Sequence, residues 1–349
     1  MNYFSRFLLT AVAGWALASC SATNHLSMTV TEPAQVALPN QVRRVGIVNR
    51  SVPAEGRQGL DKVEAILSAE GLKLDAEGAQ AALEGLADRL RLSNRFDAVM
   101  VFDSLPEVAR GIKGMPASLS RAEVAAICAK YGLDALFALS YFDTDTRVSV
   151  TLGMMEVPNQ FGVRIQVPAH AVDLETTLAN GWRVYLPDLP LALDQMEYRD
   201  MIRVSGRGVN PVEAIESIAY RKERILEQAR ETGYVHGGRL DPTRVRVGRE
   251  YFVRGSDKFT RGKRLAQTGD WDAAASLWQQ EIDHPKGKVA GRAHYNMAVI
   301  NEINGNLDEA IEWARESYAT YGTREALQYL RILQNRRAQQ EQLMAELNW

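Results

Sequence analysis

The sequence has few of the residues that build cross-linked, metal-binding or hydrolytic sites. Only two cysteines, Cys20 and Cys128, occur among the 349 residues, so at most one disulfide could form within the chain. The five histidines are scattered and show no spacing typical of metal ligands. Walker loops, serine nucleophile elbows and Cys-x-x-Cys pairs are also lacking. The sequence therefore predicts no metal, no cofactor and no enzymatic activity.

An excess of charge of one sign is lacking as well. The 41 lysines and arginines nearly balance the 43 acidic residues, and the formal net charge is −2. Nucleic-acid-binding domains usually carry a strong basic excess, so we expect no nucleic-acid partner. After the first twenty residues no apolar run approaches the ~20 residues that a membrane-spanning helix needs. The length is sufficient for two domains.

The first twenty residues contain a short apolar segment that ends at a cysteine. Arg6 precedes an apolar run at residues 7–17, which has the length of a signal-peptide core. Ala18 and Ser19 then precede Cys20. The pattern resembles the bacterial lipobox, with Ser19 where Gly or Ala is usual. The resemblance implies a signal peptide at residues 1–19 and a Cys20 that carries diacylglycerol and an N-acyl chain such as palmitate.

Such a modification would make the chain a lipoprotein that contacts the membrane through its lipid. Several acyl chains hold a protein firmly, because each buried CH₂ contributes about 0.8 kcal/mol. Ser21 rather than Asp follows Cys20, and no acidic run follows it; these features favour the outer membrane and a periplasm-facing anchor. Residues 20–40 are polar and predict a lipidated tether with a short edge strand at 28–30. The alternative is an ordinary secretory signal with an incidental cysteine.

Residues 41–253 predict an α/β module. Apolar strands are expected at residues 42–49, 98–102 and 135–142, with a helix at 79–92 between the first two. A second helix is expected from a capping box at Ser120 and Glu123 to about Lys130, with Gly132 at its C-cap and Cys128 on its buried face. The alternation of strands and helices favours a sheet with helices packed on it.

The order of these segments is similar to the periplasmic α/β module of the curli secretion lipoprotein, the penicillin-binding-protein activator lipoproteins and the N-terminal domain of the Tol-system propeller protein. The matching positions lie at residues 45–49, 86–88, 94–96 and 131–136, and the match covers roughly 42–142. The resemblance implies a protein-binding or assembly domain of the cell envelope. With the lipobox and the helical repeats described below, the chain also resembles an uncharacterised outer-membrane lipoprotein family known as a domain of unknown function.

The rest of the module predicts an antiparallel extension and a long helix. Strand-like segments occur at residues 147–152, 162–167, 169–177 and 181–186, with a hairpin turn at Asn180-Gly181. A helix is expected from Asn210 and Pro211 to about Thr232, ended by the glycines at 233, 237 and 238. Residues 243–253 alternate; they either close the sheet or lead straight into the following helices.

Residues 254–349 predict helical repeats. Aligning Gly269 with Gly305 gives a period of 36, which pairs Ala274 with Ala310. Small residues at matching positions let helices approach closely, and the pattern resembles tetratricopeptide repeats. A helix at residues 324–347 is expected to cap the stack.

Two weak candidate sites come from these patterns. Arg207 and Gly208 precede the helix at Pro211, and free amides at a helix N-terminus beside an arginine can bind an anion; a plain loop is the alternative. Arg292, Asn296 and Asn301 are predicted to line a protein-binding groove on the repeats.

The leading hypothesis is a non-enzymatic envelope adaptor that binds a protein or peptide through its α/β module and helical repeats. The alternative is an envelope enzyme or small-ligand binder that uses a cleft between the α/β module and the 143–205 extension, because active sites can assemble from distant residues. The sequence does not specify an oligomeric state.

Overall fold

The computed structural model describes residues 22–52, 62–106, 108, 114–218 and 220–347. The expected signal peptide and Cys20 lie outside these residues. The mixed fold class is confirmed: a sheet with helices and an antiparallel extension precedes a helical C-terminal segment. Among the residues described, no helix has the length and apolar character to cross a membrane. The chain forms two compact units, Ala34–Asp241 and a second that joins the residues before Ala34 to those from Pro242 onward.

The first unit, here the α/β unit, is built on a five-stranded sheet of order β3-β2-β4-β5-β6. Strand β2 is parallel to both β3 and β4, whereas β4, β5 and β6 are antiparallel neighbours. The strands are β2 (Arg44–Asn49), β3 (Ala98–Phe102), β4 (Ala135–Pro158), β5 (Arg164–Tyr185) and β6 (Asp194–Gly208).

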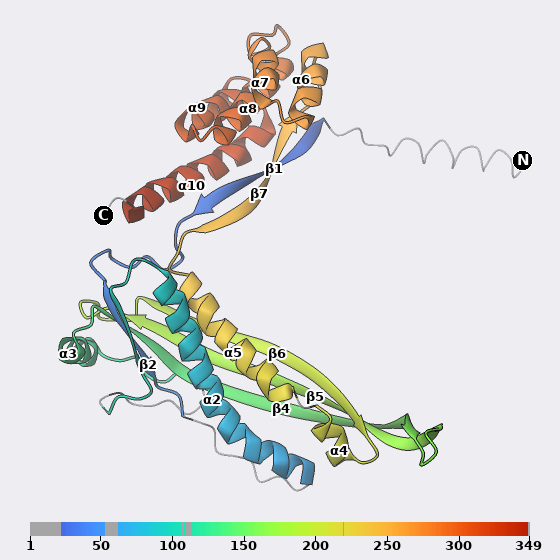
Figure 1. Cartoon of the computed structure of the whole chain (residues 1–349). Coiled ribbons are helices and arrows are strands. Elements are labelled where there is room, and N and C mark those ends of the chain that lie inside the picture. Colours follow the sequence, from blue (N-terminus) through green and yellow to red (C-terminus); the bar gives the residue numbers. More distant parts are fainter. Residues whose placement is uncertain (1–21, 53–61, 107, 109–113, 219, 348–349) are drawn as a thin grey trace, which may run out of the picture. The chain divides into compact units, whose positions relative to one another are not determined.

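Helices cover both faces of this sheet. On one face lie α2 (Lys62–Leu92), α4 (Pro211–Glu216) and α5 (Arg221–Gly238), and α2 and α5 run side by side (Figure 1). Leu83, Leu86 and Leu90 recur at helical spacing and are buried against the sheet. The other face is covered by α3 (Arg121–Tyr131), whose capping box and left-handed Gly132 C-cap are confirmed.

The glycines of α5 act differently from the prediction. A Cβ on Gly233 would lie 1.9 Å from the Ala82 carbonyl oxygen, and one on Gly85 would lie 1.9 Å from the Arg230 carbonyl oxygen. The two helix backbones therefore touch at glycines, and Gly233 lies inside α5 instead of ending it. The expected long helix is instead interrupted between Glu216 and Arg221.

The antiparallel extension has longer strands than the sequence predicts. Asn180-Gly181 is not a hairpin turn; it lies within β5, and a Cβ on Gly181 would meet the Tyr141 ring at 2.4 Å. The turn joins Pro158 to Arg164 and contains Gly162 at φ +75°. The strands β4 and β5 thus form one long hairpin that continues past α4 (Figure 1).

The second unit, here the helical unit, begins with a two-stranded ribbon. Strand β1 (Thr23–Glu32) pairs antiparallel with β7 (Thr243–Phe252), so residues 243–253 do not close the five-stranded sheet. The expected tether at 20–40 contains all of β1. The ribbon precedes α6 (Asp257–Gln267), α7 (Trp271–Gln279), α8 (Gly287–Ile303), α9 (Leu307–Ala319) and α10 (Arg324–Leu347).

The repeat corners lie where the sequence places them. Gly269 and Gly305 have φ of +86° and +82°, a backbone conformation that favours glycine. Ala274 and Ala310 are fully buried between helices. The ribbon joins this core because Tyr251 packs on Trp278 and Phe252 on Tyr295, with ring centroids 5.7 and 5.1 Å apart.

Candidate protein-binding surfaces

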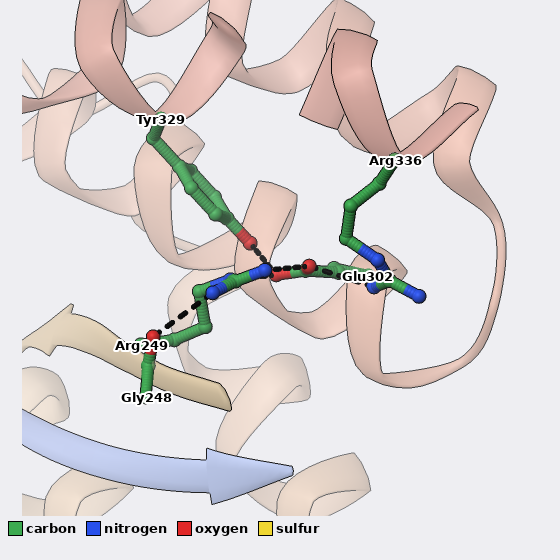
Figure 2. Close-up of polar contacts among 5 residues, drawn as sticks. All are labelled: Gly248, Arg249, Glu302, Tyr329 and Arg336. Carbon is green, nitrogen blue, oxygen red and sulfur yellow. Dashed lines mark hydrogen bonds and ion pairs between the residues drawn. The ribbon is translucent and has the colours of Figure 1, made fainter. Parts of the chain in front are cut away.

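The helical unit contains a carboxylate that is fully buried. Glu302, near the end of α8, accepts hydrogen bonds from Arg249 of β7 at 2.8 and 2.7 Å. Tyr329 and Arg336, both on α10, also donate to it, at 2.6 and 2.7 Å (Figure 2). Burial by itself raises the pKa of Glu302, but these donors outweigh it and the pKa is lowered. The carboxylate is therefore saturated by its own chain and fastens the ribbon to the helices.

The side chains predicted to line a groove on the repeats also form hydrogen bonds within their own chain. Asn296 is completely buried, and its side chain accepts from the Phe252 amide and donates to the Phe252 carbonyl, both at 2.7 Å. Arg292 lies over the Phe252 ring and donates to the Arg254 carbonyl. Asn301 donates to the Met297 carbonyl one turn back. The groove assignment is corrected for Asn296, because its face of α8 is covered by β7.

The predicted anion site at Arg207 and Gly208 is also corrected. Gly208 is buried against α4, and a Cβ there would lie 2.5 Å from the Ala214 nitrogen. The Asn210 side chain accepts from the Glu213 amide, and the Glu213 carboxylate accepts from the Val209 amide. Because α4 has only six residues and its first turn carries the Glu213 carboxylate, this end is a poor site for an anion.

Two titratable groups of the α/β unit are buried without a reactive role. Burial raises the pKa of the Cys128 thiol to about 11, so it behaves as a small apolar side chain in α3. Burial, with a smaller effect of Arg239, lowers the pKa of His236 to about 3. The His236 ring stacks on Trp182 at 5.1 Å and contacts the Tyr198 hydroxyl. Both groups serve packing between α-helices and the sheet.

The outer part of the β4–β5 hairpin exposes large apolar side chains. Leu152 and Phe161 are 82% and 80% exposed. Val150, Met154, Val163 and Ile165 are exposed as well. Nearer the sheet, Val148 and Leu174 pack under α4, so the uncovered residues start where that helix no longer reaches. Exposed apolar side chains gathered on one segment in this way can mark an interaction site.

A shallow hollow of about 440 Å³ lies on the extension. Its charged lining residues are Arg147, Asp173, Glu175 and Arg203. Glu175 and Arg203 pair with each other at 2.8 Å, which neutralises part of the lining. All of its lining residues belong to the 143–205 extension, so the hollow does not lie where the cleft of a small-ligand binder is expected, between the α/β module and the extension.

Comparison with known protein families matches nearly all of the α/β unit. A family model described as a domain of unknown function (DUF8603) matches residues 42–252. The chain belongs to this family. A second model, also described as a domain of unknown function (DUF6340), matches residues 260–335, which contain most of the helical repeats.

Other comparisons add little. No curated protein matches the chain. A solved structure, the PelC dodecamer from Paraburkholderia phytofirmans, is similar over 62% of this chain and 98% of that chain, with 9% identity and a TM-score of 0.24. A likeness at this level carries no argument about fold or function.

The hairpin surface is the feature that sequence reasoning missed. A signal was present, because residues 148–155 carry five of the exposed or partly exposed apolar side chains with no charged residue among them. The sequence predicts short strands there and therefore not the full length of the hairpin. The positions of α4 and α5 in the structure show which part of the hairpin is uncovered.

Proposed function

We propose that this chain is a lipid-anchored protein of the cell envelope that acts by binding other proteins rather than by catalysis. The observation that carries the proposal is the uncovered hairpin, with Leu152 and Phe161 each about four-fifths exposed. Leaving such side chains in water is unfavourable by roughly 1.5–3 kcal/mol each relative to burial. A partner that covers them would gain this free energy.

The chemistry of the hairpin favours a polypeptide partner. From Tyr141 outward, β4 pairs on one side only, with β5. Backbone amides and carbonyls on the other side can be satisfied by an added strand. Apolar side chains beside an open strand edge therefore suit a protein or peptide better than a small molecule.

The anchor belongs to the same proposal. Lipidation of Cys20 would hold the chain at the outer membrane, on its periplasmic side, and the helical unit would supply a second binding surface. In this arrangement the protein is an adaptor that keeps a partner near the membrane.

Photo-cross-linking in cells tests the proposal. A photo-reactive phenylalanine analogue at Leu152 or Phe161 is expected to capture a discrete protein band. The same analogue at Asp272, which is exposed on α7, is the control and should not capture that band. Cys20→Ala should weaken the capture. Phe161→Ser should abolish the capture from the analogue at position 152, and Leu152→Ser should abolish that from the analogue at position 161. Cross-links to lipid alone, or the same products from all three positions, would contradict the proposal.

The alternative is a small-ligand binder or enzyme, and the hollow at Arg147 and Arg203 is what favours it. Its charged lining suggests a small zwitterionic or anionic compound. A thermal-shift screen of such compounds on wild type and on Arg147→Ala tests it. A stabilisation that Arg147→Ala removes would transfer the proposal to this site.

A further inference from the structure

Besides the short β3, which pairs only with β2, two longer strand edges in the sheet of the α/β unit have no neighbouring strand among the described residues. On one side, β6 is the last strand of the described sheet, and its partner is β5. On the other side, β2 pairs with β4 only as far as Leu139, and within the described part of the chain no strand lies beside β4 beyond that point. The edges run over the same rows of the sheet, since Asp143, Ala179 and Arg199 are aligned across β4, β5 and β6.

Both edges are long and regular, and the protection that they carry consists of charged side chains. The pairing of β4 with β5 is regular from Tyr141 to Pro158, and that of β5 with β6 is regular throughout. Residues 141–157 and 194–208 contain no proline and no lysine. Natural edge strands are normally blunted by such residues, by bulges or by shortness. Within the described residues, the Thr144 amide of β4 donates to Asp75 and the Arg207 amide of β6 donates to Ser217.

The two edges differ in charge. Residues 141–158 carry Asp143, Asp145 and Glu156 against one arginine. In β6, the residues aligned with the open part of β4, 197–208, carry Arg199, Arg203 and Arg207 against Glu197 and Asp200. Of these, Arg203 already pairs with Glu175 of β5. The three arginines recur every four residues along β6, so they share one face of the strand. All three are exposed, on the face away from α4 and α5. Pairing β6 with β6 would bring arginines together, whereas pairing β4 with β6 brings opposite charges together.

We propose that copies of this chain assemble head to tail, the β4 edge of one copy adding to the β6 edge of the next. The inference rests on the proposed function in that it names a partner for the same hairpin. A contact between two different edges of identical chains repeats, so it builds a closed ring or an open filament. In both, one sheet continues from copy to copy.

Assembly also accounts for the apolar hairpin end. A two-stranded ribbon alone is marginal in water, and from Ala169 outward the described β5 has no β6 partner. Apolar side chains lie on both of its faces, with Leu152 and Met154 on one and Met155, Val157 and Ile165 on the other. A neighbouring copy added at β4 gives this ribbon a third strand, whose side chains would flank the apolar ones on both faces.

A charge swap between the edges tests the proposal. Asp143→Arg with Asp145→Arg gives residues 141–158 three arginines against Glu156, so both edges of that variant are basic. Arg199→Asp leaves residues 197–208 with three acidic residues against two arginines, so both edges of that variant are acidic. Each variant alone is expected to assemble about tenfold more weakly than wild type, measured as mass by sedimentation velocity on the purified full chain. An equimolar mixture should regain the wild-type mass, because every basic β4 edge then finds an acidic β6 edge. Failure of the mixture to recover would overturn the proposal, as would a monomeric wild type.

Cysteine cross-linking reports the strand order directly. Ser149 and Ser205 lie on one row, separated by Asp173 of β5, so their Cα atoms are two strand spacings apart, about 9.6 Å. A disulfide spans less than ~7 Å, so Ser149→Cys with Ser205→Cys cannot link within a chain. Oxidation is expected to give a ladder of multimers; Met201→Cys or Arg203→Cys in place of Ser205→Cys covers other registers.

The single variants are the matched controls and allow the two proposals to fail separately. Each single variant should stay monomeric on a denaturing gel; dimers from Ser205→Cys alone would show β6–β6 pairing and reject the head-to-tail contact. A monomeric wild type whose Phe161 analogue still captures another protein in cells would reject self-assembly and leave the adaptor standing. If the charge-swap mixture regains the wild-type mass but neither analogue captures another protein in cells, self-assembly would stand and the adaptor would be rejected.

Discussion

Glu302 is the residue at which β7, α8 and α10 meet, and its side chain is completely buried. We expect Glu302→Gln to destabilise the helical unit by about 3–5 kcal/mol, because Arg249 would remain buried without its counter-charge. Urea unfolding followed by hydrogen exchange of α8 amides measures this. The control, Glu312→Gln, removes an exposed pair with Arg315 and should stay within about 0.5 kcal/mol of wild type.

Asn296 provides a second test at the same contact. Asn296→Ala leaves both the amide and the carbonyl of Phe252 buried without a partner. We expect a loss of about 2–4 kcal/mol in the free energy of unfolding of the helical unit. Asn301→Ala removes a single local bond to Met297 and should cost less than about 1 kcal/mol. Equal effects of the two variants would contradict the role given to Asn296.

The buried His236 makes the free energy of unfolding of the α/β unit depend on pH. Its pKa is lowered from 6.5 to about 3, so the unfolded chain binds more protons between these values. Stability is therefore full above about pH 6.5 and falls as the pH drops toward 3, by up to about 1.4 kcal/mol per unit. His236→Phe keeps a ring against Trp182 and should flatten this slope. An unchanged slope, measured by urea unfolding at pH 4 to 7, would count against it.

At the level of elements, the α2–α5 contact is the tightest packing in the α/β unit, because backbone meets backbone at Gly85 and Gly233. We expect Gly233→Ala to separate the helices and destabilise this unit by about 1–3 kcal/mol. Gly71→Ala, on α2 with no atom within 4 Å of the added Cβ, is the control and should be neutral or stabilising by up to about 1 kcal/mol. Thermal unfolding ranks the two; a stabilising Gly233→Ala would refute the packing account.

The elements that local chemistry defines were predictable from the sequence. The capping box of Ser120 and Glu123 and the positive-φ corners at Gly269 and Gly305 depend on a few neighbouring residues. Gly181 and Gly233 were misread because their role depends on Tyr141 and Ala82, which are far away in the chain. Periodicity gives the start of a strand such as β4 but not its length, since pairing partners decide where it ends.

The candidate sites were less predictable for the same reason. Whether Asn296 faces a ligand or a strand depends on where β7 lies, and β7 lies there because it pairs with β1, more than two hundred residues earlier. The pattern at Arg207 showed a helix start but not that the Glu213 amide would donate to Asn210 and the Val209 amide to Glu213. Local spacing thus identified polar groups, but it could not show that other parts of the chain occupy their hydrogen-bonding positions.

For the molecule as a whole, the ribbon makes the helical unit discontinuous in sequence. Replacing residues 23–32 by a Gly/Ser linker of the same length removes the partner of β7 and the contact of Leu26 with the helical core. We expect protection of β7 amides against hydrogen exchange to fall about a hundredfold. Amides of α2 belong to the other unit and should exchange as in wild type, which makes them the internal control. Equal loss in both units would show that they do not unfold separately.

The separation of β1 from β7 also sets an order of events during synthesis. At about 5–20 residues per second, the ribosome needs tens of seconds after making β1 to deliver β7. The α/β unit, residues 34–241, is completed within that interval, while β1 still has no partner. Any factor that recognises unpaired strands therefore has a window in which β1 is available, and that window closes only when the last third of the chain emerges.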